Sequence, residues 1–298
     1  MSAAEAVSAT PEPRTQDVLV DERPARRALP GRFLRSELAI MLGRRRNLAL
    51  LGVLAAIPVL IAVAIKASSD DAGQGGPGFF DAITSNGLFV AFAALAAELP
   101  LFLPLAVAAV AGDAVAGEAN LGTLRYMLTI PAGRVRLLAT KYVAIVIYAL
   151  LATTLVAVAG VLAGLALFGG GDVVLLSGTT TSFADGLGRL GLSVLYLTVG
   201  FAALGAIGLF ISTLTEQPIA AIVATVGVNV LMFIATAITQ LDWLHPWLLV
   251  NWWSAFGDLL RDPAATGSIS RGLLTALVYA VVFLAASWLR FRRKDITS

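Results

Sequence analysis

The chain has 298 residues, of which 58% are apolar and only 13% charged, with a mean hydropathy of +0.86. Soluble domains carry about 25% charged residues, so this composition excludes an ordinary soluble protein and indicates one that lies in a bilayer. The net charge of +2 is spread over membrane-flanking segments, which argues against nucleic-acid binding, and the absence of cysteine excludes disulfides and zinc-thiolate sites.

The chain begins with a polar segment that lacks the apolar core of a signal peptide, so residues 1–30 are predicted to be a disordered cytoplasmic tail. The following segment, 31–46, is partly amphipathic, with Glu37 interrupting its apolar side. It is interpreted as an interfacial helix on the inner leaflet, and the alternative is a solvated arm beside the membrane.

Six apolar stretches are long enough to cross a membrane, which takes about 20 residues. The predicted spans are 48–66, 88–111, 138–168, 190–213, 218–240 and 272–290. They predict an all-α polytopic membrane protein with one transmembrane domain over 31–294 and a short cytoplasmic tail at 295–298.

The basic residues set the orientation of these spans. Six spans put both termini on one side, and that side receives 17 of the 21 Lys and Arg residues. Because short cytoplasmic segments retain positive charge, both termini are predicted to be cytoplasmic. The long outer segment before span six, 241–271, holds four of the five tryptophans and is interpreted as half-inserted helices.

The motifs of soluble enzymes are missing. His245 is the only histidine and stands in an outer "WLHPW" stretch, where a chemical role is disfavoured. No glycine precedes any of the three lysines, so the chain has no Walker-type nucleotide site. We therefore expect neither enzymatic activity nor a cofactor in this chain.

Glu98 is a carboxylate deep inside the second apolar stretch, followed by Pro100 and Pro104. A charge near the bilayer centre costs at least about 2.5 kcal/mol, so its side chain should face protein or a wet cavity. Two hypotheses remain open: a polar element of a translocation path, or a protonated acid bonded to carbonyls that the prolines leave free.

Gly160 and Gly164 form a G-x-x-x-G pattern in span three. Small residues at this spacing allow helices to approach closely. Packing inside the bundle is favoured over a dimer seam.

The stretch after span two reads "GEANLGTLRYMLTIPAGRVRLLATK". It resembles the cytoplasmic connection in permease subunits of ATP-binding cassette (ABC) exporters of the type-two family. The matching positions, to which we add Arg125 from the same stretch, are Glu118, Gly122, Thr123, Leu124, Leu128, Pro131, Arg134 and Lys141.

The resemblance implies that this stretch forms a coupling helix, which docks on a separate ATPase subunit. The leucines recur at helical spacing and give an apolar stripe, and the arginines can pair with acidic groups or lipid phosphates. The alternative is an ordinary positively charged loop with an interfacial helix.

The resemblance further implies an exporter in the plasma membrane that pairs with a second permease, a copy or a paralogue, and moves an amphipathic or hydrophobic cargo outward. ATP and Mg would be bound by the partner ATPase. The expected liners of the translocation path lie in spans two and five: Phe92, Glu98, Leu101, Asn229 and Phe233. The alternative is a self-contained proton-coupled transporter that uses Glu98, or a membrane scaffold.

Overall fold

A computed structural model describes residues 30–71, 86–122 and 134–293 of the chain. Within these ranges six helices are long and apolar enough to cross a membrane. They are α2 (Arg45–Asp71), α5 (Phe102–Asn120), α7 (Arg134–Phe168), α8 (Phe183–Leu214), α9 (Pro218–Ala237) and α10 (Thr266–Arg293). The protein is an all-α, multi-pass membrane protein, as the composition predicts.

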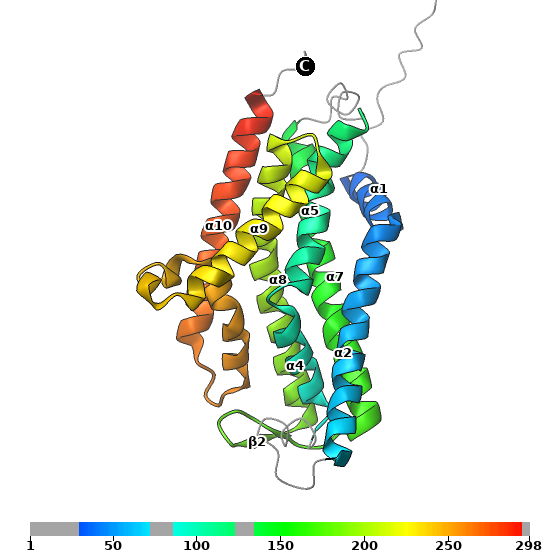
Figure 1. Cartoon of the computed structure of the whole chain (residues 1–298), viewed down its shortest axis with the longest axis vertical. Coiled ribbons are helices and arrows are strands. Elements are labelled where there is room, and N and C mark those ends of the chain that lie inside the picture. Colours follow the sequence, from blue (N-terminus) through cyan, green and yellow to red (C-terminus); the bar gives the residue numbers. More distant parts are fainter. Residues whose placement is uncertain (1–29, 72–85, 123–133, 294–298) are drawn as a thin grey trace, which may run out of the picture.

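The helices form one elongated bundle with two distinct ends (Figure 1). Helix α1 (Pro30–Gly43), the C-terminal ends of α5 and α10 and the start of α7 gather at one end, which we call the α1 end. The opposite, hairpin end carries two short antiparallel strands, β1 (Val173–Val174) and β2 (Thr180–Thr181).

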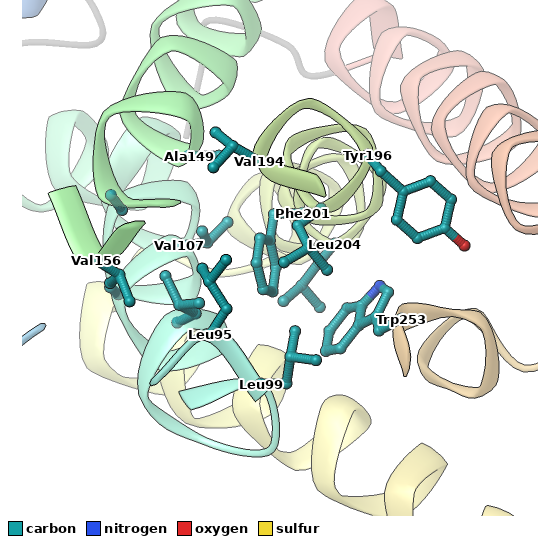
Figure 2. Close-up of a cluster of buried hydrophobic side chains, with 14 of the residues drawn as sticks. Leu95, Leu99, Val107, Ala149, Val156, Val194, Tyr196, Phe201, Leu204 and Trp253 are labelled. Atoms are coloured by element: carbon teal, nitrogen blue, oxygen red, sulfur yellow. The ribbon is translucent and has the colours of Figure 1, made fainter. Parts of the chain in front are cut away.

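Helices α5 and α8 form the centre of the bundle. In the most apolar stretch of each of these two helices 72% of the residues are buried, whereas the value is 17% for α9 and for α10. Figure 2 shows a cluster of buried side chains, among them Leu95, Val107 and Phe201. Helices in lipid associate mainly through close packing, because lipid tails are as apolar as leucine. The broad apolar faces of α9 and α10 are therefore suited to lipid or to another membrane protein.

The prediction of a single second span over 88–111 is wrong. The chain forms α4 (Leu88–Glu98), a break, and then α5, which continues to Asn120. Pro100 has no N–H to donate, and Leu101 leaves helical geometry with φ −138° and ψ −54°. At 11 residues α4 is about 16 Å long, too short to cross a bilayer, so α5 is the spanning helix.

The other five predicted spans are confirmed as helices, although their ends differ. Four of them begin earlier than predicted, α8 at Phe183 and α10 at Thr266 for instance, because polar residues continue a helix after the apolar run ends. The segment before α10 is helical but of the 3-10 type: η1 (Thr239–Leu241), η2 (His245–Trp247) and η3 (Leu249–Leu260).

The G-x-x-x-G pattern of α7 packs inside the chain, against α4. A Cβ on Gly164 would collide with the backbone of Gly87, and one on Gly160 would meet the backbone of Ala91. Both glycines are therefore required for the contact between α4 and α7, in agreement with the packing interpretation.

Candidate functional site

A cluster of buried charges lies at the α1 end and joins three helices. Lys141 of α7 is only 2% exposed, and its Nζ lies 2.7 Å from Oε1 of Glu37 on α1. The same Nζ lies 3.6 Å from Oε1 of Glu118 on α5. Glu118 and Lys141, two residues of the predicted coupling motif, are thus brought together around one ammonium group.

Glu37 explains the irregularity in the amphipathic pattern of α1. Its carboxylate interrupts the apolar side of the helix because that side faces the bundle, where Lys141 is its partner. Phe33, Leu34 and Leu38 of the same helix are partly buried against the core. The helix is therefore held to the bundle by apolar packing and by one buried ion pair.

The second part of the cluster is centred on Asp113 of α5, whose side chain is 10% exposed. It pairs with Arg44, in the turn between α1 and α2, and lies 3.4 Å from Nη2 of Arg46. Arg46 Nη2 also donates to the backbone carbonyl of Ala109, at 3.3 Å. Charged groups thus fix both ends of the α1–α2 turn against α5.

The turn between α1 and α2 is closed by an amide. Asn47 is 1% exposed, and its Nδ2 donates to the carbonyl of Met41 at 2.8 Å. That carbonyl belongs to the last turn of α1, where backbone acceptors lose their helical partners. Asn47 therefore satisfies a buried acceptor and fixes the angle at which α1 meets α2.

Between the two parts of the cluster, α8 inserts a hydroxyl into the backbone of α5. Ser212 Oγ accepts from the amides of Val115 and Ala116, at 3.0 and 2.9 Å, and donates to the carbonyl of Gly112 at 2.7 Å. A side chain within the hydrogen-bond ladder of a helix is a usual cause of local bending. Ser212 thus links α8 to the part of the α5 backbone that lies between Asp113 and Glu118.

The cluster surrounds a cavity of only about 30 Å³, lined in part by Glu37, Asp113 and Lys141. This volume holds about one water molecule and no organic ligand. Among the described residues, the printed ion pairs of the cluster join three acids, Glu37, Asp113 and Glu118, to three bases, Arg44, Arg46 and Lys141. The arrangement is therefore suited to holding helices together, not to binding a substrate.

Two further residues of the predicted coupling motif, Gly122 and Arg134, belong to the described ranges. Gly122 follows the end of α5 with a φ of +70°, a left-handed conformation that favours glycine. Arg134 is the first residue of α7. Thr123, Leu124, Arg125, Leu128 and Pro131 lie outside the described residues.

A second group of polar side chains lies at the break between α4 and α5. Glu98 is 0% exposed, and neither of its carboxyl oxygens has a hydrogen-bond partner within the described ranges. The hypothesis of an acid bonded to freed carbonyls therefore does not describe this structure. A buried polar group without a partner is costly, so Glu98 is a candidate for a functional group.

Asn229 of α9 meets this break. Its Nδ2 donates to the carbonyl of Pro100 at 3.2 Å, and its Oδ1 is buried without a partner among the described residues. In a regular helix that carbonyl would accept from residue 104, which is also a proline. Asn229 therefore supplies the donor that Pro104 lacks.

The remaining predicted liners of the translocation path have different neighbours. The Phe92 ring lies near Phe89 of its own helix, with centroids 6.3 Å apart, whereas Phe233 meets Trp253 of η3 at 6.0 Å. Leu101 is 44% exposed. Leu99, at the break, points toward the indole of Trp253 in Figure 2. The structure thus joins Asn229 to the α4–α5 break, while Phe92 and Phe233 contact different aromatic partners.

Sequence reasoning missed Arg44, Asp113 and Ser212. Asp113 was placed just outside the second span because the predicted helix ended at 111, although "GDAVAGE" puts two acids in one turn and a half. Arg44 was counted only as a topology signal. Ser212 carries no signal at all, because a serine in an apolar helix is common and its partners lie about 100 residues away.

The imidazole ring of His245 contacts neighbouring groups of the outer segment and of α9. Its Nε2 lies 3.0 Å from the carbonyl of Ala235, and its Nδ1 lies 3.4 Å from Asp242. No group of three His, Cys, Asp or Glu side chains that could hold a metal occurs in the described part of the chain.

The fold and these two sites define a class: a multi-pass helical membrane protein with a charged helix junction at one end and a buried carboxyl at a broken span. The chain belongs to the family described as "Protein of unknown function (DUF2705)", whose profile matches residues 55–297. No match is found among the curated proteins.

Proposed function

We propose that this chain is the permease subunit of an ABC exporter of the type-two family. It moves an amphipathic or hydrophobic cargo outward by alternating access, and a separate ATPase subunit supplies the work. The chain is not itself an enzyme, since ATP and Mg are bound by that partner. The proposal is supported by the coupling motif and by the buried charge cluster around Lys141, in which two residues of that motif take part.

The observation that carries this proposal is the pairing of Lys141 with Glu118 and Glu37. Glu118 is the second residue of the coupling stretch and Lys141 is its last, so both ends of that stretch are tied to one buried centre. A force applied to the stretch would therefore act on α1, α5 and α7 together. An ordinary loop needs no such buried anchor, whose desolvation is costly.

The membrane orientation proposed here puts the α1 end in the cytoplasm. Basic residues of α1, the α1–α2 turn, the start of α7 and the end of α10 lie at that end. The hairpin end has four basic residues: Lys66, Arg189, Arg261 and Arg271. Helix α1 then lies at the inner leaflet, and η1–η3 form the half-inserted outer segment. The proposed location is the plasma membrane.

The second permease, a copy or a paralogue, would pack on the exposed apolar side of the bundle. Both α9 and α10 expose large side chains there, such as Leu231 of α9 at 66% and Leu274 of α10 at 62%. Apolar surface of this kind binds lipid equally well. The proposal assigns part of it to the dimer because α9 adjoins the α4–α5 break, where the path is expected.

The coupling stretch is tested by changing Leu124→Asp and Arg125→Glu together. We expect the tagged wild-type chain, purified from its native membrane in mild detergent, to carry a subunit with a Walker motif that hydrolyses ATP. The double variant should lose at least about 90% of that activity, because a charge in the apolar stripe and a reversed charge each cost over 1 kcal/mol at an interface. The measurement is ATP hydrolysis per mole of tagged chain.

A matched control makes the same two kinds of change at the hairpin end, with Leu176→Asp and Arg271→Glu. Both side chains are exposed there, so association should be unchanged. Wild-type chain that carries no nucleotide-hydrolysing subunit under these conditions, or a double variant that retains it fully, would contradict the proposal.

A second candidate is a self-contained transporter coupled to protons or another cation. It is favoured by the broken span and by the unpartnered Glu98, since discontinuous helices commonly form ion sites in secondary transporters. This candidate predicts cargo movement in proteoliposomes that hold the chain alone, driven by an imposed pH gradient without ATP. A scaffold predicts no cargo movement with or without ATP.

A further inference from the structure

The carboxyl group of Glu98 has no counter-charge within reach in the described part of the chain. The basic residues of the six long helices lie toward the helix ends: Arg45, Arg46, Lys66, Arg134, Arg136, Lys141, Arg189, Arg271, Arg290, Arg292 and Arg293. Lys141 is already engaged with two other carboxylates at the α1 end. An ionised Glu98 would therefore need a counter-charge from a group that the described chain does not supply.

Asn229, the second polar side chain at the break, further defines which kind of group could bind there. Asn229 uses its amide nitrogen on the carbonyl of Pro100, so the amide is oriented and its Oδ1 is the atom left without a partner. Pro100 follows Glu98 by two residues. The unpartnered atoms of these two side chains are all oxygens: two on Glu98 and one on Asn229. The indole Nε1 of Trp253 is also buried without a partner, and it lies against Gly200 of α8.

A set of oxygen acceptors that includes a carboxyl recognises a cation that donates hydrogen bonds. An ammonium group satisfies both requirements, because it has up to three N–H donors and a positive charge. A neutral alcohol can donate one hydrogen bond but leaves the carboxylate unbalanced. In a surrounding of low polarity that difference is large, because an unpaired buried charge is costly.

The surroundings of the junction fit the apolar part of such a molecule. Leu101 and Phe102, directly after the break, are 44% and 39% exposed. Met232 and Phe233, one turn after Asn229 on the same side of α9, are partly buried. These side chains give an apolar surface next to the buried oxygens. A molecule with an ammonium head and an apolar tail matches the two environments.

We infer that Glu98 and Asn229 form the recognition site for the head group of an amphipathic ammonium cargo. The inference rests on the proposed function, since it names the class of cargo that the permease carries. Glu98 balances the charge, and Asn229 accepts a hydrogen bond while its nitrogen stays on Pro100. The tail lies on the apolar surface beside the break.

The test compares dodecylamine, which is protonated at pH 7, with 1-dodecanol, a neutral molecule of the same length. Binding of both probes is measured on the permease complex in nanodiscs, for wild type and for Glu98→Gln. The measured quantity is the ratio of the affinity for the amine to the affinity for the alcohol. This ratio should be at least tenfold larger for the wild type than for Glu98→Gln. Both proteins share the same lipid, so partitioning into the bilayer cancels in this comparison.

A second variant, Glu98→Asp, keeps the charge and should retain most of the preference for the amine, which also shows that changes at this position are tolerated by the fold. An equal preference in wild type and Glu98→Gln would overturn the inference, as would wild type that binds the alcohol as tightly as the amine. Because the chain can be assayed without an ATPase, amine selectivity remains measurable even if no such subunit associates. Failure of the inference is thus distinct from failure of the proposed function.

Discussion

Replacing Lys141 with methionine is expected to lower the melting temperature of the purified protein by about 10 °C. The substitution keeps the length of the side chain but leaves Glu37 and Glu118, which are 14% and 12% exposed, without their shared cation. Breaking a buried ion pair by removing one partner costs about 3–5 kcal/mol, and each kcal/mol corresponds to about 2–4 °C for a chain of this size. Thermal unfolding in detergent measures the shift.

The matched control is Lys66→Met, at the opposite end of the bundle. Lys66 is exposed, and exposed ion pairs contribute at most about 1 kcal/mol, so the melting temperature should fall by no more than about 4 °C. A triple variant, Lys141→Met with Glu37→Gln and Glu118→Gln, removes all three charges and should recover at least half of the loss. Equal melting temperatures for the Lys141 and Lys66 variants would show that the cluster does not hold the helices together.

The second large effect is expected at the contact between α4 and α7. Valine at position 164 would place its Cβ inside the backbone of Gly87, where no side-chain rotation can relieve the collision. We expect Gly164→Val to cost at least about 3 kcal/mol and to prevent recovery of a monodisperse protein. Size-exclusion chromatography after mild heating, compared with wild type, measures this loss.

Gly191→Val provides the control, because it introduces the same side chain on a helix where nothing lies within 4 Å of the added Cβ. The helix propensities of glycine and valine differ by less than about 1 kcal/mol, so this variant should behave like wild type. A stable Gly164→Val protein would mean that α4 can move away from α7, and that the break at Pro100 is a flexible connection.

The cluster and the α4–α5 break lie on the same central element. Helix α5 begins at the break near Glu98, is bonded by Ser212 along its middle, and ends beside Lys141. Helix α5 thus connects the α1 end with the α4–α5 break, on whose other side Glu98 ends α4. The proposed transport cycle uses this helix to connect ATP hydrolysis with cargo release.

The class of protein and the order of its spans were predictable from the sequence. Apolar runs of sufficient length determine membrane insertion whatever the helices pack against, and the distribution of Lys and Arg indicates the orientation. Pro100 and Pro104 predicted a disturbance in the second apolar run, although not that α4 and α5 would separate. These properties are local, because they depend on neighbouring residues and on the bilayer.

The pairs that make up the two sites were not predictable, because each joins residues far apart in the chain. Lys141 and Glu37 are 104 positions apart, and Asn229 and Pro100 are 129 apart. Composition shows that a buried charge needs a partner but cannot say which one, since that depends on how the helices pack. The sequence alone determined a bundle of membrane helices, and only the tertiary structure decided that Glu37 meets Lys141 and that Glu98 meets no partner in the described chain.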